Sequence, residues 1–279
     1  MNSDTTLVIG GNGKTGRRVA QQLARAGKAV RVASRSTAIP FDWDNQATWT
    51  SALRDVRSAY VTYQPDLAVP GALQTVDAFF AAAIDSGVEK LVLLSGRGED
   101  EALAAEAALQ AKRADWTILR ASWFNQNFNE GVFLDSILAG EFALPAMLAA
   151  EPFVDVDDIA DIACAALTTS THSRQLYELT GPQALTFAEA IAQIARATGR
   201  SIAFVPVSIA EYRAELVRQQ LPPEYVDLVI YLFETVLDGR NTPVTDGVQR
   251  ALGRPARSFA DFVKNAAATG VWGGDHARA

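Results

Sequence analysis

The glycine-rich stretch GGNGKTG near the start of the chain constrains the fold more than any other part of the sequence. It follows the apolar run TTLVI and precedes RRVAQQLARA, which is a predicted helix. Gly10, Gly13 and Gly16 therefore have the spacing G-x-x-G-x-x-G between a strand and a helix. Side chains at such positions would prevent the helix from packing closely on the strand. They would also prevent a pyrophosphate from approaching the backbone. The stretch predicts a dinucleotide cradle.

The start of that helix would supply the binding groups. The first backbone N–H groups of a helix lack partners within it and carry a partial positive charge, so they bind phosphate. A P-loop is excluded, because Lys14-Thr15 lies inside the glycine triplet. The alternative is a tight turn without a ligand. The predicted cofactor residues of the turn are Gly10, Asn12, Gly13, Lys14, Thr15 and Gly16.

Strands and helices alternate through the first half of the chain. Runs rich in Val, Ile and Leu that alternate with helices are typical of parallel strands with helices on both faces. The sequence therefore predicts an α/β fold, a doubly wound parallel sheet of the Rossmann type with a smaller, mainly helical C-terminal cap. The predicted strands are 7–10, 30–33, 59–63, 91–94 and 116–119, and the predicted helices are 16–26, 47–53, 71–86 and 100–112.

The alternation loosens after about residue 120. Residues 1–150 are predicted to form an NADP-binding Rossmann domain, and residues 151–279 a mixed region that returns to the sheet and forms the substrate cap. In this second region we expect short strands at 153–156 and 202–207 and helices at 159–167 and 187–198. A long helical segment, 211–237, is broken at Pro222-Pro223.

The residues at the end of the second predicted strand distinguish an NAD(H) site from an NADP(H) site. An NAD site usually has an acid there for the ribose hydroxyls. Here the sequence is RVASRST, and residues 29–41 contain no Asp or Glu. Arg35 can pair with a 2′-phosphate, and Ser34 and Ser36 can add hydroxyl donors. The predicted cofactor is NADP(H), unless Arg35 is only a solvated loop charge.

Other candidate site residues follow from the fold, because ligands of doubly wound sheets bind beyond the carboxyl ends of the strands. Thr62, Tyr63 and Gln64 are expected beside the cofactor, and Ser95 and Gly96 below the nicotinamide. After the next strand, Trp123 and Phe124 could face the ring, and Asn125 could hydrogen-bond a carboxamide or a substrate carbonyl. The alternatives are packing roles for Tyr63, Trp123 and Phe124, and a loop cap for Asn125.

Several blocks of the chain resemble the NmrA-like branch of the atypical short-chain dehydrogenase/reductases. They are GGNGKTGRRVA, SRS, VEKLVLLSG, ADWTILRASWFNQNF and EPFVDVDDIADIA, within residues 7–167, and YELTGPQALTFAEAIAQIARATGR, which extends to about residue 200. The resemblance implies an NAD(P)-binding protein. The branch includes NADPH-dependent quinone reductases, fungal reductases of iminium ions, and NADP-binding regulators without known turnover.

The chain departs from that superfamily at the usual acid/base. None of its six tyrosines has a lysine four residues on, so the pair Tyr-x-x-x-Lys is missing. Ser95 stands where the superfamily's catalytic serine ends its strand. Glu106 fits the glutamate that follows the motif, which puts Gly98 and Ala102 at the Tyr and Lys positions. Because alcohol oxidation needs a base for the hydroxyl proton, an ordinary alcohol dehydrogenase is not expected.

The sequence thus favours an NADP(H)-dependent reductase that transfers a hydride to an electron-poor small molecule. Quinones, iminium ions and conjugated carbonyls spread or neutralise the charge that develops, so they depend less on a protein acid. The catalytic candidates are Ser95, Tyr63 and Asn125. The alternative, which the missing pair keeps open, is a non-catalytic NADP(H)-binding redox sensor that acts through a protein partner.

Composition sets the remaining expectations. A formal charge of −7 over 279 residues, without a basic block, argues against nucleic acid as a partner. Nothing at the N-terminus resembles a signal peptide, and no apolar run approaches the ~20 residues that span a bilayer. With Cys164 as the single cysteine, we expect a cytoplasmic protein without a membrane partner.

No metal is expected. His172 and His276 are far apart, and the aspartates of FVDVDDIAD are better explained by a helix N-terminus, with Asp157 or Asp158 as its cap. An apolar stripe with helical spacing is typical of a core face or of a homodimer interface. Its members are Tyr225, Leu228, Val229, Leu232, Phe233 and Val236.

Overall fold

The computed structural model describes residues 4–145 and 148–273, which form two compact units. The first unit contains the chain up to Ala121 together with Val156–Leu179 and Gly247–Arg254. The second contains Ser122–Asp155, Thr180–Asp246 and the chain from Pro255 onward. Each unit is therefore built from separated segments of the chain.

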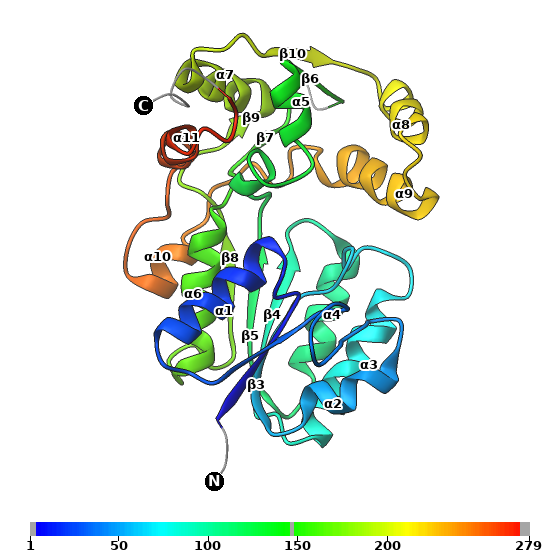
Figure 1. Cartoon of the computed structure of the whole chain (residues 1–279), viewed down its shortest axis with the longest axis vertical. Coiled ribbons are helices and arrows are strands. Elements are labelled where there is room, and N and C mark those ends of the chain that lie inside the picture. Colours follow the sequence, from blue (N-terminus) through cyan, green and yellow to red (C-terminus); the bar gives the residue numbers. More distant parts are fainter. Residues whose placement is uncertain (1–3, 146–147, 274–279) are drawn as a thin grey trace. The chain divides into compact units, whose positions relative to one another are not determined.

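A six-stranded parallel sheet forms the centre of the first unit (Figure 1). The strand order is β2-β1-β3-β4-β5-β8, and every neighbouring pair is parallel. The chain leaves β1 on one side to form β2 and returns on the other side to form β3, which creates a switch point between β1 and β3. The strands are β1 (Thr5–Ile9), β2 (Val30–Ala33), β3 (Val56–Val61), β4 (Lys90–Gly96), β5 (Asp115–Ala121) and β8 (Gln175–Leu179).

Helices cover both faces of this sheet. On one face α1 packs against α6, and on the other α2 and α4 flank α3 (Figure 1). The helices are α1 (Lys14–Arg25), α2 (Trp49–Leu53), α3 (Ala72–Asp85), α4 (Asp100–Gln110), α6 (Val156–Thr168) and α10 (Gly247–Leu252), with a 3₁₀ turn at Gln46–Thr48.

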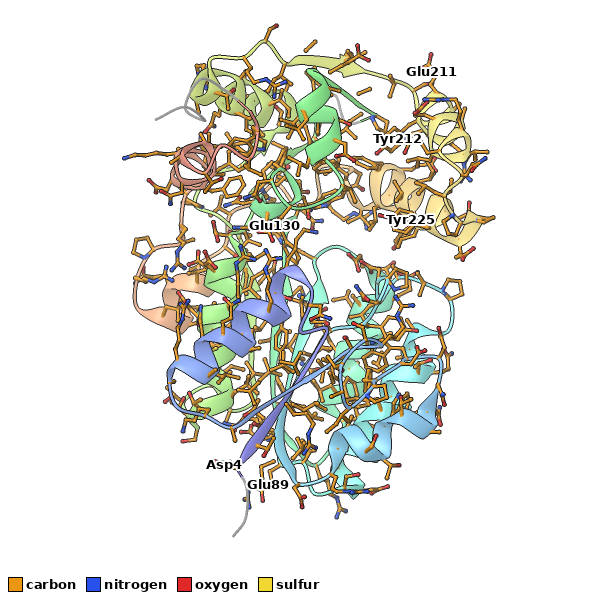
Figure 2. The ribbon with its side chains drawn as sticks, in the orientation of Figure 1. Asp4, Glu89, Glu130, Glu211, Tyr212 and Tyr225 are labelled. Atoms are coloured by element: carbon orange, nitrogen blue, oxygen red, sulfur yellow. The ribbon has the colours of Figure 1, made fainter. Side chains whose placement is uncertain are left out.

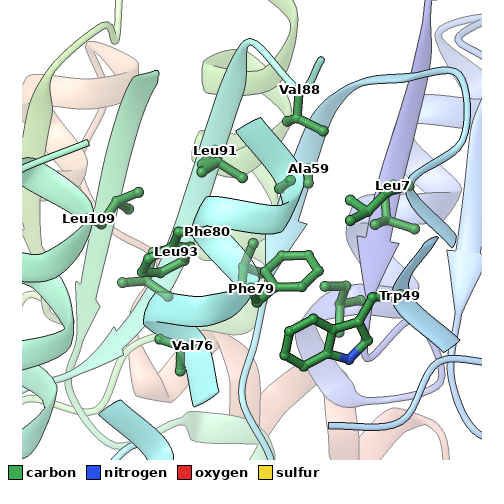
Figure 3. Packing of buried hydrophobic residues seen from close by; sticks show 14 of the residues in the cluster. Leu7, Trp49, Ala59, Val76, Phe79, Phe80, Val88, Leu91, Leu93 and Leu109 are labelled. Atoms are coloured by element: carbon green, nitrogen blue, oxygen red, sulfur yellow. The ribbon is translucent and has the colours of Figure 1, made fainter. Parts of the chain in front are cut away.

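The core beneath α2 and α3 is aromatic. Phe79 is fully buried, and its ring meets that of Trp49 edge to face at 5.5 Å (Figure 3). Phe41 and Trp43 pack on the same rings. Edge-to-face contacts of this kind add to the hydrophobic gain from burial. This packing fixes α3 against the sheet and so positions the loop between β3 and α3.

The second unit combines short strands with helices. β6 (Glu141–Leu144) pairs in parallel with β10 (Ala203–Pro206), and β7 (Ala150–Glu151) pairs antiparallel with β9 (Leu185–Thr186). The helices are α5 (Leu134–Ala139), α7 (Phe187–Thr198), α8 (Ile209–Arg218), α9 (Pro223–Tyr231) and α11 (Phe259–Ala268), with a 3₁₀ turn at Asn125–Asn127 and a π-helical turn at Leu232–Val236.

An aromatic core also holds the second unit together. Phe128 contacts five other phenylalanine rings, and Trp272 is fully buried with its Nε1 donating to the carbonyl of Phe128 at 2.7 Å. On the outer helices, Tyr212 of α8 and Tyr225 of α9 are half-buried (Figure 2). Trp272 therefore ties the end of the described chain to the centre of the unit.

The predicted α/β class with a doubly wound parallel sheet is confirmed. The sixth strand, β8, is absent from the prediction because its sequence QLYEL is partly polar, and Glu178 within it pairs with Arg97. The predicted strand at 153–156 is reduced to a single bridge between Val154 and Phe124. The roles assigned to residues 1–150 and 151–279 stay a prediction, and the contacts divide the chain at other points.

Half of the apolar stripe of the 211–237 segment is buried, and of its members Phe233 lies in the aromatic core of the second unit with Val229 packed against that core. Leu228, Phe233 and Val236 are buried, while Tyr225, Val229 and Leu232 are partly exposed. A homodimer interface on the partly exposed residues stays a prediction. Each helix within residues 4–145 and 148–273 is too short or too polar to cross a membrane.

Trp272→Ala is predicted to destabilise the protein strongly. Truncating a buried tryptophan costs about 3–5 kcal/mol, which lowers Tm by roughly 10 °C in a chain of this size. Trp272→Phe keeps most of the volume and loses only the bond to Phe128, so its loss should be about 1–3 kcal/mol. Thermal unfolding followed by circular dichroism checks both variants. Val217→Ala, at a side chain that is 59% exposed, is the control and should leave Tm unchanged.

Candidate functional site

The glycine turn brings α1 into direct backbone contact with the end of β1. The N–H of Gly13 donates to the carbonyl of Gly10 at 2.8 Å. A Cβ on Gly16 would lie 2.3 Å from the same carbonyl oxygen, closer than atoms can approach. The turn therefore closes only with glycine at position 16, as a dinucleotide cradle requires.

The N-terminus of α1 lacks a side-chain cap, unlike those of α7, α8 and α11. Thr186, Ser208 and Ser258 cap α7, α8 and α11 with hydroxyls that accept backbone N–H groups. Gly13 caps α1 without a side chain, and the first turn of α1 contains no acid. The first N–H groups of α1 thus keep their capacity to bind an anion, so the turn fits the pyrophosphate of a dinucleotide.

Cationic side chains gather at the same helix end. Burial lowers the pKa of Lys14, and the neighbouring charges of Arg17 and Arg18 lower it further. Arg18 donates from Nε to Asp157 of α6 at 2.7 Å, which fixes one of these charges. Like charges held together in this way favour a polyanionic ligand. Arg17 was missing from the predicted site, although it directly follows the glycine triplet.

The turn is joined to the end of β2 through side chains. Asn12 donates from Nδ2 to the hydroxyl of Ser34 at 3.0 Å and to that of Ser36 at 3.3 Å. Arg35 between them is exposed, and no group in the described part of the chain pairs with its guanidinium. The structure thus brings Asn12, Ser34 and Ser36 together and leaves Arg35 available to an anion.

The residues predicted after β3 take up different surroundings. Thr62 donates its hydroxyl to the carbonyl of Ile9 at 3.3 Å, next to the glycine turn. The ring of Tyr63 lies 4.9 Å from that of Trp43, and its hydroxyl hydrogen-bonds with Thr75 of α3. Burial raises the pKa of Tyr63. Gln64 is exposed. Tyr63 therefore takes part in packing, and its catalytic role stays a prediction.

Ser95, at the end of β4, is 4% exposed and hydrogen-bonds inward. Its hydroxyl donates to Glu106 Oε1 at 2.6 Å, and Arg120 of β5 donates to the two oxygens of the same carboxylate at 2.9 and 2.5 Å. A buried carboxylate is stable in such a setting because each oxygen is satisfied by a donor. Ser95 thus supports the attachment of α4 to the sheet, and its catalytic role is a prediction that these contacts leave open.

A second buried carboxyl of this region is surrounded by acids. Glu99 precedes α4, is 7% exposed, and lies close to Asp66 of the loop between β3 and α3. Burial is the first cause that raises the pKa of Glu99, to about 9, followed by the charge of Asp66, the hydrogen bond between the two groups, and the charge of Glu101. Burial also raises the pKa of Asp66, against the hydrogen bond from Ala68 N–H at 2.9 Å.

The hydrogen bond between the two carboxyl groups determines which of them carries the shared proton. A hydrogen bond from Glu99 favours the charged form of Asp66, and the same bond favours the neutral form of Glu99. At neutral pH the pair therefore holds a proton on Glu99, which donates to Asp66. This pair cannot be predicted from local sequence patterns, because residues 66 and 99 become neighbours only through the parallel arrangement of β3 and β4.

Trp123, Phe124 and Asn125 belong to the second unit. Trp123 packs on Phe133, Phe187 and Phe233. Asn125 is fully buried and donates from Nδ2 to Asp155 at 3.2 Å. Phe124 forms a parallel bridge with Val154 and is partly exposed. The cofactor and substrate roles of these three residues stay predictions.

The aspartates of FVDVDDIAD make hydrogen bonds and ion pairs with residues distant in sequence. The helix begins at Val156, so Asp157 and Asp158 lie in its first turn rather than at its cap. Asp157 pairs with Arg18, and Arg254 bridges Asp158 and Asp161 at 2.7 and 2.6 Å. Within residues 4–145 and 148–273 no group of three potential ligands could hold a metal ion, and His276 lies outside these residues.

The chain is similar to known proteins over almost its whole length. It is 32% identical over 285 residues to the uncharacterised oxidoreductase YesF of Bacillus subtilis, with 98% of this chain and 99% of that protein covered. It is 28% identical to an NAD(P)H azoreductase of Xenophilus azovorans, with 95% and 99% covered. No family model matches the chain.

Among solved structures, the fold is similar to that of the NADPH-dependent quinone oxidoreductase QOR2 of Escherichia coli in complex with NADPH. The TM-score is 0.77 at 20% identity, and the match covers 94% of this chain and 99% of that one. The predicted Rossmann-type fold is thereby confirmed.

The Glu99 carboxyl predicts a stability that falls as pH rises. The unfolded chain releases this proton near the usual pKa of 4.5, whereas the folded chain keeps it until about 9. Between these values the folded state binds more protons, so the free energy of unfolding decreases with pH. Glu99→Gln cannot ionise and should lose less Tm than the wild type between about pH 5 and 9. Asp100→Asn, at the exposed neighbouring acid, should follow the wild-type curve; parallel curves for all three proteins would contradict the assignment.

Proposed function

The chain belongs to the NmrA-like branch of the atypical short-chain dehydrogenase/reductases, and we propose that it reduces an electron-poor small molecule with a hydride from NADPH. It is an NAD(P)-dependent oxidoreductase. The substrate classes that fit are a quinone, an iminium ion or a conjugated carbonyl. The assignment to the family rests on the 32% identity to an oxidoreductase over 98% of the chain.

The choice of NADPH rests on the end of β2. The exposed Arg35 lies between Ser34 and Ser36, which the Asn12 side chain links to the glycine turn. A guanidinium with two neighbouring hydroxyls suits the planar, multiply bonded recognition of a phosphate. The α1 N-terminus would hold the pyrophosphate, with Lys14 and Arg17 adding positive charge.

The substrate class rests on one observation, the residues at the usual acid/base positions. Gly98 has no side chain, and Ala102 is fully buried in the hydrophobic core of the first unit. Neither can protonate a simple ketone or alkoxide, so acceptors that stabilise their own charge are favoured. The similarity to an azoreductase and to a quinone oxidoreductase supports this class.

The chain's own residues would mainly bind and orient. A bound reduced nicotinamide supplies the hydride, and the reaction then depends on the distance and angle between donor and acceptor. Thr62, held by the carbonyl of Ile9, and Gly96 at the end of β4 are proposed to border the cofactor. Ser95 keeps the β4 end rigid through Glu106.

Arg35→Ala is predicted to reduce the preference for NADPH over NADH about tenfold. A hydrogen bond to a charged group contributes about 1.5–3 kcal/mol, and exposure of Arg35 favours the lower limit. Binding of each cofactor, measured by fluorescence titration, checks this. Arg25→Ala removes an exposed arginine at the far end of α1 and should leave both affinities unchanged. An unchanged NADPH/NADH ratio in Arg35→Ala would refute the assignment of the 2′-phosphate site.

The wild type is expected to oxidise NADPH with quinones, N-alkyl iminium ions and conjugated carbonyls, and to be much slower with simple ketones. Absorbance of NADPH at saturating cofactor measures each rate. Tight NADPH binding without turnover on any acceptor would instead favour a redox sensor that acts through a protein partner.

A further inference from the structure

The turn before α4 directs a carboxyl group toward the carboxyl end of the sheet. Gly98 has φ +83°, a left-handed conformation that a tyrosine or another side-chain-bearing residue rarely adopts. Glu99 follows it at the N-cap of α4, but its side chain makes no capping hydrogen bond. The turn thus frees the Glu99 side chain from the helix end.

The Glu99 carboxyl lies directly over Gly96, the last residue of β4. A Cβ on Gly96 would be 2.2 Å from Oε1 and 2.3 Å from Oε2 of Glu99. Glycine at this position therefore leaves room for the carboxyl group at the edge of the sheet. In doubly wound folds the reacting part of a ligand binds beyond this edge.

Glu99 is nine-tenths buried, and no cation in the described part of the chain acts on its carboxyl group. Its Oε2 is buried and receives no hydrogen bond from any donor in residues 4–145 and 148–273. The charged groups that act on it, Asp66 from the β3–α3 loop and Glu101 from α4, are both acids. A buried carboxyl in such surroundings stays neutral and can donate a proton.

We propose that Glu99 is the proton donor of the reduction and that Asp66 is its positioning partner. The proposal rests on the proposed reductase function and gives Glu99 a narrower role than the missing Tyr-x-x-x-Lys pair: it protonates an oxygen whose developing charge the acceptor already delocalises. It concerns acceptors whose product carries a new O–H bond.

With a conjugated carbonyl as acceptor, hydride and proton transfer together form one C–H bond and one O–H bond. The hydride and its electron pair form a new C–H bond at the β-carbon of the acceptor, and the displaced π electrons move to the carbonyl oxygen. The O–H bond of Glu99 breaks, its electron pair stays on the carboxylate, and the proton forms an O–H bond with the substrate oxygen. Asp66, which is half-buried, then takes a proton from bulk solvent and passes it along the hydrogen bond to Glu99, so the pair returns to the form with its proton on Glu99.

Different acceptors separate this role from a structural one. An N-methyl iminium ion becomes a neutral amine when it gains a hydride, so its reduction consumes no proton. A conjugated ketone needs one. Positioned general acids contribute roughly 10²–10⁴-fold in rate. Glu99→Gln should therefore lower kcat for the conjugated ketone about 100-fold and leave the N-methyl iminium ion within about twofold of the wild type. The variant retains an amide that can donate to Asp66.

The variant Asp66→Asn tests the positioning role of Asp66. Removal of its negative charge lowers the pKa of Glu99, so the fall in kcat at alkaline pH should begin at lower pH for the conjugated ketone. The rate at pH 6 should stay close to that of the wild type. Asp100→Asn is the matched control, and its pH profile should not move.

A readout without turnover tests the proton itself. Infrared difference spectra of the cofactor-free protein should show the C=O stretch of a buried protonated carboxyl at pH 7, absent from Glu99→Gln. A missing band, or equal losses on both acceptors, would overturn the proton-donor role while the reductase function stands. If the wild type reduces no acceptor at all, the proposed function fails, and the proton-donor role fails with it.

Discussion

The contact between Gly16 and the carbonyl of Gly10 determines how the first unit is organised. It sets the start of α1 against the end of β1, at a distance that excludes any side chain. Because α1 packs on α6, this contact also fixes the place where α6 meets the sheet. The switch point between β1 and β3 lies at the same edge, so the uncapped N–H groups of α1 face the crevice in which such folds bind nucleotides.

Two glutamates beside α4 show how surroundings determine the state of a buried acid. Glu106 is 2% exposed and accepts hydrogen bonds from Ser95 and both ends of the Arg120 fork. These donors satisfy both oxygens of the carboxylate, which anchors the helix. Glu99 faces acids instead, so it keeps a proton. One carboxyl therefore contributes to rigidity and the other is available for proton transfer.

Local patterns were enough to predict the sheet and the glycine turn between β1 and α1. Apolar strands, glycine spacing and the SRS segment each act over a few residues, and the first five strands of the sheet lie where the sequence placed them. Interactions between distant residues were not predictable. β8 was missed because Glu178 is stabilised by Arg97, 81 residues away, and the Asp66–Glu99 pair depends on the register of β3 against β4.

The loss of the usual tyrosine and the presence of Glu99 have one structural origin. In the tyrosine-dependent enzymes that this chain resembles, the acid lies on the helix after the fourth long strand. Here the helix begins only at Asp100, and the position that corresponds to tyrosine is the left-handed Gly98. A tyrosine could not adopt this turn without strain. The same turn places the next residue, Glu99, over Gly96. The same turn thus leaves no tyrosine at the sheet edge and brings Glu99 there, and Glu99 retains its proton because the carboxyl is buried beside Asp66.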